Sequence, residues 1–356
     1  MRSQGWTGNT HIPMLVASVV FCGFLLVACS SGSSNSPPPP TPPSALVHFD
    51  ALWSDFDSTY SFFDLKGIDW NDSRSRFRAT LSSTSTDSEL FNALSSMLLE
   101  LEDPHVRLDT SVGASTYTGW FDQFPSNFDE SIVTATYLGA SAMMSPQVNM
   151  VYGRIDVDIG YIHIHTLSGT GHAVDIESIL DQLTGVRALI LDLRGNGGGN
   201  DQNGEAIAAR FTDMTRLYRR VRFRDGPAHS DFGPFIDGFI SPSGTQTFQG
   251  PLAILTNRST VSSAESLALA FAALPNAVSV GDYTGGGSGN PVQRTLANGW
   301  QYTVSQWIEY RPDNTTFEGI GLEPNIRTDI SLTDAAALRD TIMETAISDL
   351  RIRIAP

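Results

Sequence analysis

The residues best suited to chemistry are the Ser-Ser-Ala-Glu run at Ser262–Glu265 and the glycine-rich loop at Arg194–Gly199. The serine would lie at the start of a helix, and a turn rich in glycine leaves backbone N–H groups accessible. Acyl transfer needs these two parts, a hydroxyl nucleophile and N–H donors for the oxyanion that its attack creates. The two stretches therefore predict a candidate site for acyl transfer.

Ser262 also has a purely structural interpretation. Ser262-x-x-Glu265 is the spacing of a capping box, in which serine and glutamate satisfy free N–H groups at a helix start. These residues alone favour a cap over catalysis, but the two roles are compatible because the helix N-terminus favours negative charge. No G-x-S-x-G elbow surrounds Ser262, which argues against an α/β-hydrolase.

The loop Gly195–Gly199 has several interpretations. A dinucleotide fingerprint is excluded, because Asn200 stands where a third glycine is needed and no acidic residue ends a strand ~20 residues later. A phosphate-binding P-loop is excluded because the Gly-Lys-Ser/Thr ending is missing. A tight turn and an oxyanion loop remain.

Histidines offer candidate bases and ligands. His163 and His165 would share one strand face and, with His172, offer ligands for a metal ion. No Asp or Glu at ligand spacing accompanies them, so we expect neither a metal nor another cofactor. The pattern alone does not select a catalytic base.

The elements around the two stretches predict an α/β fold with a mixed sheet. Apolar strands are expected at Ala188–Leu193, Leu252–Thr256 and Ala277–Val280, and helices at Glu205–Phe211 and Ser262–Leu274. Strand, helix and strand at this spacing form a parallel crossover unit. If the strands before the two loops are parallel neighbours, both loops meet at the carboxyl edge of the sheet.

The remaining patterns are local. Residues 45–108 read as a small helical subdomain, with Leu90, Leu94 and Met97 at helical spacing and Asp87 or Ser88 as N-cap. Residues 109–356 would form the α/β core. Further β-like runs are Ile132–Tyr137, Val148–Tyr152 and Ile159–His165. Asn298-Gly299 predicts a hairpin between Val292–Ala297 and Trp300–Ser305.

The N-terminus predicts export. Arg2 precedes the apolar run Met14–Ala28, which suits a signal peptide at residues 1–28. Small residues before Cys29 resemble a bacterial lipobox, so Cys29 would carry a lipid; the alternative is an ordinary signal peptide. Residues 29–44 form a Ser/Pro-rich tether. We expect a lipid-anchored protein on a bacterial membrane, at the outer membrane or periplasmic face, since Ser30 does not resemble an inner-membrane retention signal.

Cysteine content and charge exclude other classes. Cys22 and Cys29 are the only cysteines, so after removal of the signal the body has no disulfide and no thiol nucleophile. A net charge of −16 argues against nucleic acid as a partner.

Four segments, in this order, resemble the C-terminal-processing peptidase and tricorn family. Leu101–His105 is similar to its L-x-D-x-H motif, and Leu191–Gly199 to D-x-R-x-N-x-G-G. Ser262–Glu265 with Val280–Gly287 resembles the nucleophile region, and Phe317–Asn325 the closing E-G-x-G-x-x-P-D segment. The resemblance implies a crotonase-like, ClpP-like α/β core and a peptide or protein substrate.

The resemblance also implies site residues. Ser-Lys members carry their lysine at the position of Gly287, so the tricorn-like Ser-His-Glu type is implied here. Ser262 would be the nucleophile, His105 the general base and Glu318 the orienting acid. Amides of Ser263 and of Gly197 or Gly198 would form the oxyanion hole.

Two departures leave alternatives open. Pro104 stands where tricorn has a serine that links the histidine to the glutamate, so either Glu318 contacts His105 directly or Asp103 orients it. The segment after His105 is too short for the PDZ domain of many relatives. PDZ-free relatives include the ligand-carrying modules of interphotoreceptor retinoid-binding protein, so a non-catalytic binding module is an alternative, as is an esterase with the same triad.

Overall fold

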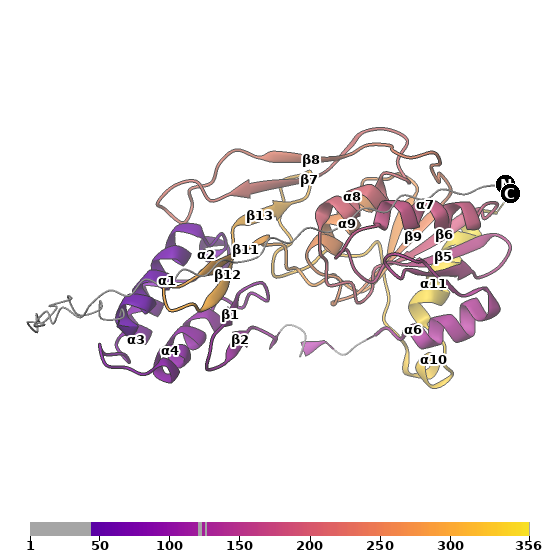
Figure 1. The fold of residues 1–356 in the computed structure, drawn as a ribbon. Coiled ribbons are helices and arrows are strands. Elements are labelled where there is room, and N and C mark those ends of the chain that lie inside the picture. The colour runs from indigo at the N-terminus through magenta and orange to yellow at the C-terminus, as the bar shows by residue number, and fades with distance from the viewer. Residues whose placement is uncertain (1–43, 120–122, 125–126, 356) are drawn as a thin grey trace, which may run out of the picture. The chain divides into compact units, whose positions relative to one another are not determined.

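The computed structural model describes residues 44–119, 123–124 and 127–355 (Figure 1). The predicted signal peptide, Cys29 and the tether up to residue 43 lie outside the described residues.

The N-terminal helices pack on a small antiparallel sheet. The helices are α1 (Ala45–Thr59), α2 (Phe63–Lys66), α3 (Trp70–Arg78) and α4 (Asp87–Leu99). The sheet has the order β11-β12-β1-β2, with β1 (Arg107–Asp109), β2 (Ala114–Thr116), β11 (Pro291–Thr295) and β12 (Gln301–Ser305). Phe56, Trp70 and Leu94 share one core with Tyr302 and Val304. The helices predicted for residues 45–108 therefore bury their apolar faces against a hairpin from the C-terminal half.

A hairpin and a helix start were predicted in this region. The hairpin around Asn298-Gly299 is present, but its turn is longer than the two residues predicted: the Leu296 N–H donates to the Trp300 oxygen at 2.8 Å, and Gly299 has φ +85°. The N-cap of α4 is Thr86 instead of Asp87 or Ser88, because Thr86 and Glu89 form a complete capping box.

A seven-stranded sheet forms the centre of the α/β core, in the order β14-β10-β9-β6-β5-β4-β3. Five strands of this sheet, β5, β6, β9, β10 and β14, run parallel to one another, whereas β3 and β4 are antiparallel to their neighbours. Their bounds are β3 (Met143–Met144), β4 (Val151–Arg154), β5 (Ile159–His163), β6 (Ala188–Asp192), β9 (Leu252–Thr256), β10 (Ala277–Gly281) and β14 (Ile326–Arg327). The mixed α/β fold is as predicted.

Helices cover both faces of this sheet (Figure 1). Leu189 and Leu191 of β6 face the core built with α7 (His172–Gln182), α8 (Asp201–Ala208) and α9 (Ser263–Ala272). Ala188 and Ile190 face α11 (Thr341–Arg353). Because alternate residues point to opposite faces, the whole strand is apolar. Burial of each such leucine or isoleucine contributes about 1.5–3 kcal/mol.

The other elements lie outside these layers. A third sheet has the order β13-β7-β8 and is antiparallel. The bounds are β7 (Arg216–Phe223), β8 (Ile236–Ile240), β13 (Trp307–Tyr310), α6 (Glu130–Ile132), the π-helical turn Val133–Leu138, the 3₁₀ turn Gly139–Ser141 and α10 (Leu332–Ala336).

The prediction of a strand at Ile132–Tyr137 is wrong. This stretch ends one helix and continues into a π-helical turn, and Val133 of that turn packs into the core beside α11.

The order of the sheet brings the two chemical stretches together. β6 and β9 are parallel neighbours, with Leu189 opposite Leu252 and Asp192 opposite Leu255. The glycine loop follows β6 and the serine turn follows β9. Both therefore lie at the same carboxyl edge, as predicted.

Candidate active site

The serine of the Ser-Ser-Ala-Glu run lies in a strained turn between β9 and α9. Ser262 directly precedes α9 with φ +62° and ψ −133°. Residues other than glycine rarely adopt this conformation, which costs about 1–3 kcal/mol and is typical of active sites. In a capping box the Ser262 oxygen accepts from the helix, so the proton of the hydroxyl would remain available for transfer to a base.

Glu265, in the first turn of α9, joins the serine turn to the loop after β10. Its buried carboxylate accepts hydrogen bonds from the N–H of Ser262 at 3.1 Å and from the N–H groups of Gly286 and Gly287 at 2.7 and 2.9 Å. Thr284 Oγ1 donates to the same carboxylate. Burial raises the pKa of Glu265, and these donors oppose the rise. The glutamate half of the predicted capping box is therefore formed, and it also fixes a second loop.

The glycine loop touches the serine turn. A Cβ built on Gly198 would lie 2.8 Å from Ser262 Cβ and 2.9 Å from Ser263 N, so this close approach requires glycine. The Gly198 N–H donates to Asn196 Oδ1 at 2.9 Å. The main-chain oxygen of Asn196 accepts from the Val261 N–H at 3.0 Å. The loop is thus fastened to the turn, and the amide of Gly198, one of the predicted oxyanion donors, is engaged by Asn196.

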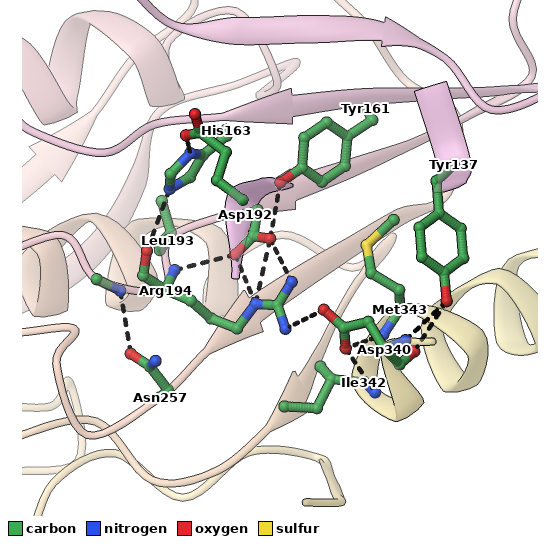
Figure 2. A network of polar contacts seen from close by, with 12 residues as sticks. Tyr137, Tyr161, His163, Asp192, Leu193, Arg194, Asn257, Asp340, Ile342 and Met343 are labelled. Carbon is green, nitrogen blue, oxygen red and sulfur yellow. Dashed lines mark hydrogen bonds and ion pairs between the residues drawn. The ribbon is translucent and has the colours of Figure 1, made fainter. Parts of the chain in front are cut away.

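A buried group of charges holds the start of the glycine loop (Figure 2). The Arg194 guanidinium lies between the carboxylates of Asp192 and Asp340, with N–O distances of 2.6 and 2.7 Å. All three side chains are almost fully buried. Burial acts to raise the pKa of Asp192, but the Arg194 charge and its hydrogen bonds bring that pKa below its ordinary value. Since Asp340 is also the N-cap of α11, the loop is tied to the last helix.

Two of the three histidines considered as metal ligands, His163 and His172, have other partners. His163 Nδ1 lies 2.7 Å from the Glu130 carboxylate, and its Nε2 lies 3.1 Å from the main-chain oxygen of Arg194. His172 Nε2 lies 3.0 Å from the main-chain oxygen of Thr166. Within the described ranges, no three His, Cys, Asp or Glu side chains are grouped to hold a metal ion. His163 instead supports the glycine loop through the Arg194 carbonyl.

Replacing Arg194 with methionine is expected to lower the free energy of unfolding by about 3–5 kcal/mol, because two buried carboxylates lose their shared cation. The deficit should shrink as the pH falls. Without the cation, burial raises the folded-state pKa of Asp192 above its unfolded value, so protonation favours the folded state. Urea denaturation at several pH values measures both effects.

Arg339 provides the matched control for that experiment. It is half exposed and pairs with Asp334 and Glu344 at the surface, so Arg339→Met should change the free energy of unfolding far less than Arg194→Met. Equal losses in the two variants would contradict a structural role for the buried charge group.

His105 lies in a turn held by Asp103 and β12. Asp103 is fully buried; its Oδ1 accepts from the His105 N–H at 2.8 Å and its Oδ2 from Ser305 Oγ at 2.8 Å. Thr303 Oγ1 donates to the main-chain oxygen of His105 at 2.6 Å. The imidazole Nδ1 lies 3.8 Å from Asp103 Oδ1. Burial lowers the pKa of His105, opposed by the Asp103 charge and assisted by that of Lys66, which favours the neutral ring.

Glu318 belongs to the same buried group but has different contacts. Its Oε2 accepts from the N–H and Oγ of Ser288 at 2.8 and 3.1 Å, and its Oε1 lies 3.7 Å from Lys66 Nζ. Burial and the nearby Asp103 charge raise the pKa of Glu318 to about 8, although Lys66 and the Ser288 N–H oppose the rise. Glu318 therefore holds the loop that contains Ser288, next to Gly287.

Gly287 connects the base to the nucleophile turn. Its main-chain oxygen accepts from the Ser262 N–H at 2.9 Å. A Cβ built on Gly287 would lie 3.5 Å from His105 Cε1. The structure thus brings Ser262, Gly198 and His105 around one edge of the sheet. Lys66 was missed by sequence reasoning, because no motif marks it.

The chain is similar to known peptidases. The chain matches the family model described as peptidase family S41 over residues 158–328 and that of the tricorn protease C1 domain over residues 45–99. It is 25% identical over 196 residues to the carboxy-terminal processing protease CtpA of Bacillus subtilis (strain 168). That match covers 51% of this chain and only 38% of the length of CtpA.

Solved structures share the fold. A putative peptidase from Parabacteroides merdae ATCC 43184 is 32% identical, with a TM-score of 0.79 over 86% of this chain and 96% of that chain. Mature CPAF is 13% identical, with a TM-score of 0.67 over 88% of this chain and 98% of that chain. The similarity to CPAF concerns the fold alone.

Proposed function

The chain belongs to peptidase family S41, and we propose that it hydrolyses peptide bonds of a peptide or protein through an acyl-enzyme on Ser262. One observation carries this proposal. The strained Ser262 turn lies between the glycine loop, at 2.8 Å from a Cβ built on Gly198, and Gly287, which borders the His105 ring. Nucleophile, oxyanion donors and base of an acyl-transfer site therefore have their expected neighbours.

The position of Gly287 supports histidine as the base. The family resemblance puts the lysine of Ser-Lys members at this position. A Cβ on Gly287 would meet Val261 Cγ1 at 3.1 Å and His105 Cε1 at 3.5 Å. The imidazole therefore borders the place where that lysine side chain would begin.

The proposed reaction follows from these placements. The neutral ring of His105 takes the proton of Ser262 Oγ as the oxygen attacks the carbonyl carbon of the substrate. The amides of Ser263 and Gly197 stabilise the oxyanion; we assign this role to Gly197 because Asn196 engages Gly198. His105 then returns the proton to the leaving amine, and a water molecule hydrolyses the ester.

We assign the orientation of His105 to Asp103 in place of Glu318. Asp103 Oδ1 lies 3.8 Å from His105 Nδ1 and already binds the His105 N–H. Catalytic hydrogen bonds are often longer in free enzymes and tighten in the substrate complex. Glu318 then acts on the loop at Ser288, so the Ser-His-Glu triad implied by the resemblance becomes a Ser-His-Asp triad.

Two amide variants distinguish these assignments. Asp103→Asn is expected to lower kcat/KM at least ~10²-fold, because the neutral amide no longer stabilises the imidazolium. Glu318→Gln should lose less, since the amide oxygen still accepts from Ser288. Steady-state kinetics on both variants measures the order of the two losses. The reverse order would restore Glu318 as the orienting acid.

A binding module on the same fold and an esterase are the rival functions. The test incubates the chain lacking residues 1–44 with a mixed peptide library and identifies products by mass spectrometry, beside the Ser262→Ala variant. Peptide products that require Ser262 support the peptidase. Folded protein without products favours the binding module, and cleavage of only aryl esters favours the esterase.

We also propose that Cys29 anchors the protein to a bacterial membrane, at the outer membrane or periplasmic face. The support is the lipobox-like sequence Leu26–Cys29 and the tether behind it. No helix among the described residues has the length and apolar character to cross a membrane. Mass spectrometry of the mature N-terminal peptide tests the anchor, and an unmodified Cys29 would rule it out.

A further inference from the structure

Lys66 is the only lysine among the 356 residues; every other cationic side chain of the chain that is permanently charged is an arginine. It ends α2, in the N-terminal helical region, and its side chain is mostly buried with 16% exposed. Such a lysine is costly to bury unless its ammonium is paired. Its contacts therefore indicate what holds it there.

The Lys66 ammonium binds three different oxygens. It donates to the main-chain oxygens of Leu101 and Glu102 at 3.0 and 3.1 Å, and it lies 3.7 Å from Glu318 Oε1. An ammonium has three donors and no acceptor. The ammonium thus makes two hydrogen bonds and one ion pair, and because it has no lone pair while it is protonated, it is not suited to act as a base.

Two of these oxygens belong to the turn that carries the catalytic base. Leu101 and Glu102 directly precede Asp103-Pro104-His105, and Glu102 has the left-handed φ of +47°. Side-chain contacts on carbonyls of a helix end stabilise such turns. Lys66 thus holds the residues before the turn, while Thr303 and Ser305 of β12 hold His105 and Asp103.

The third oxygen belongs to the carboxylate that fixes the nucleophile loop. Glu318 accepts from the N–H of Ser288, and the preceding residue, Gly287, accepts from the Ser262 N–H. A path of short contacts therefore runs from the turn of His105 through Lys66 and Glu318 to the turn of Ser262.

We propose that Lys66 is a positioning residue of the site: its ammonium ties the His105 turn to Glu318 and so sets where the imidazole stands relative to Ser262. The inference rests on the proposed hydrolysis. Arginine would keep the charge but not the geometry, because its larger, planar guanidinium presents donors in directions that differ from those of the compact ammonium.

The test compares Lys66→Met and Lys66→Arg with the native chain. Lys66→Met should lower kcat by ~10²-fold with KM nearly unchanged, as expected for a misplaced catalytic group. Lys66→Arg should also lose kcat, because the geometry changes although the charge stays. Native kcat in both variants would overturn the proposal.

The pH profile tests whether the Lys66 charge acts on His105. The charged groups facing His105 are Asp103 and Lys66, and the Lys66 charge lowers the His105 pKa. Its removal raises that pKa, so the acid limb of kcat/KM should move to higher pH in Lys66→Met and stay near its native position in Lys66→Arg. An unchanged limb in folded Lys66→Met would show that the Lys66 charge does not act on His105 and would overturn the proposal.

An NMR titration measures the pKa of the His105 ring without any need for activity, so it tests the role of Lys66 separately from the proposed function. If the native chain shows no Ser262-dependent hydrolysis, the proposed function fails. An upward shift of the His105 pKa in Lys66→Met would then still support the contact of Lys66 with this turn. No shift in folded Lys66→Met, together with native kcat where activity exists, refutes the role of Lys66.

Discussion

Replacing Ser262 with alanine is expected to reduce peptide hydrolysis by at least ~10⁴-fold while the protein stays folded. The variant retains the glycine loop and the amide of Ser263, so substrate binding and oxyanion stabilisation persist, but no oxygen remains to attack the substrate. Glu265 still holds the turn through the main-chain N–H of residue 262. Progress curves at high enzyme concentration, with thermal unfolding in parallel, measure both quantities.

Ser259→Ala is the matched control for this variant. Ser259 lies in the same β9–α9 connection, three residues before the nucleophile, and contacts Asn257 through its main-chain N–H. Its rate should remain near native. If Ser259→Ala and Ser262→Ala lose activity equally, the connection as a whole matters and the Ser262 hydroxyl has no special role.

Replacing His105 with glutamine should lower kcat/KM by a similar factor, about 10⁴-fold, because glutamine cannot accept the proton of Ser262. The native pH profile should carry the signature of the same group. The base must be neutral, and burial puts the His105 pKa below its ordinary value of 6.5. Activity should therefore persist to mildly acidic pH and fall only below that value.

His229→Gln controls for the general effect of losing an imidazole. His229 stacks on Phe63 and pairs with Asp57 at 2.9 Å, contacts that are separate from those of His105. Near-native kinetics are expected. If the residual activity of His105→Gln still falls at acidic pH as the native activity does, another group causes that fall and acts as the base.

The parts of the site that follow strands were predictable from sequence. The apolar runs at β6 and β9 are long enough for buried strands, and the residues after them carry glycine or serine. Their parallel pairing then fixes the meeting of the two loops without side-chain detail. The hairpin was also predictable, because Asn-Gly between two strand-like runs is a strong turn signal, although the turn is longer than expected.

The contacts that tune the site were not predictable in this way. Arg194 and Asp340 are 146 positions apart and meet only because α11 covers the sheet. Lys66 reaches Glu318 from another subdomain, and no motif marks either end of that pair. The assignment of a strand to Ile132–Tyr137 failed because β-branched residues on a π-helical turn give the same composition as a strand.

The measurement that tests the central claim most directly is covalent labelling of the native chain with a fluorophosphonate, a probe that reacts with activated serine hydroxyls. Fragmentation of the tryptic peptide that begins after Arg258 locates the adduct among its serines. The proposed mechanism predicts a single adduct on Ser262 and none in Ser262→Ala or His105→Gln. An adduct on another serine, or equal labelling of native and Ser262→Ala protein, would contradict Ser262 as the nucleophile.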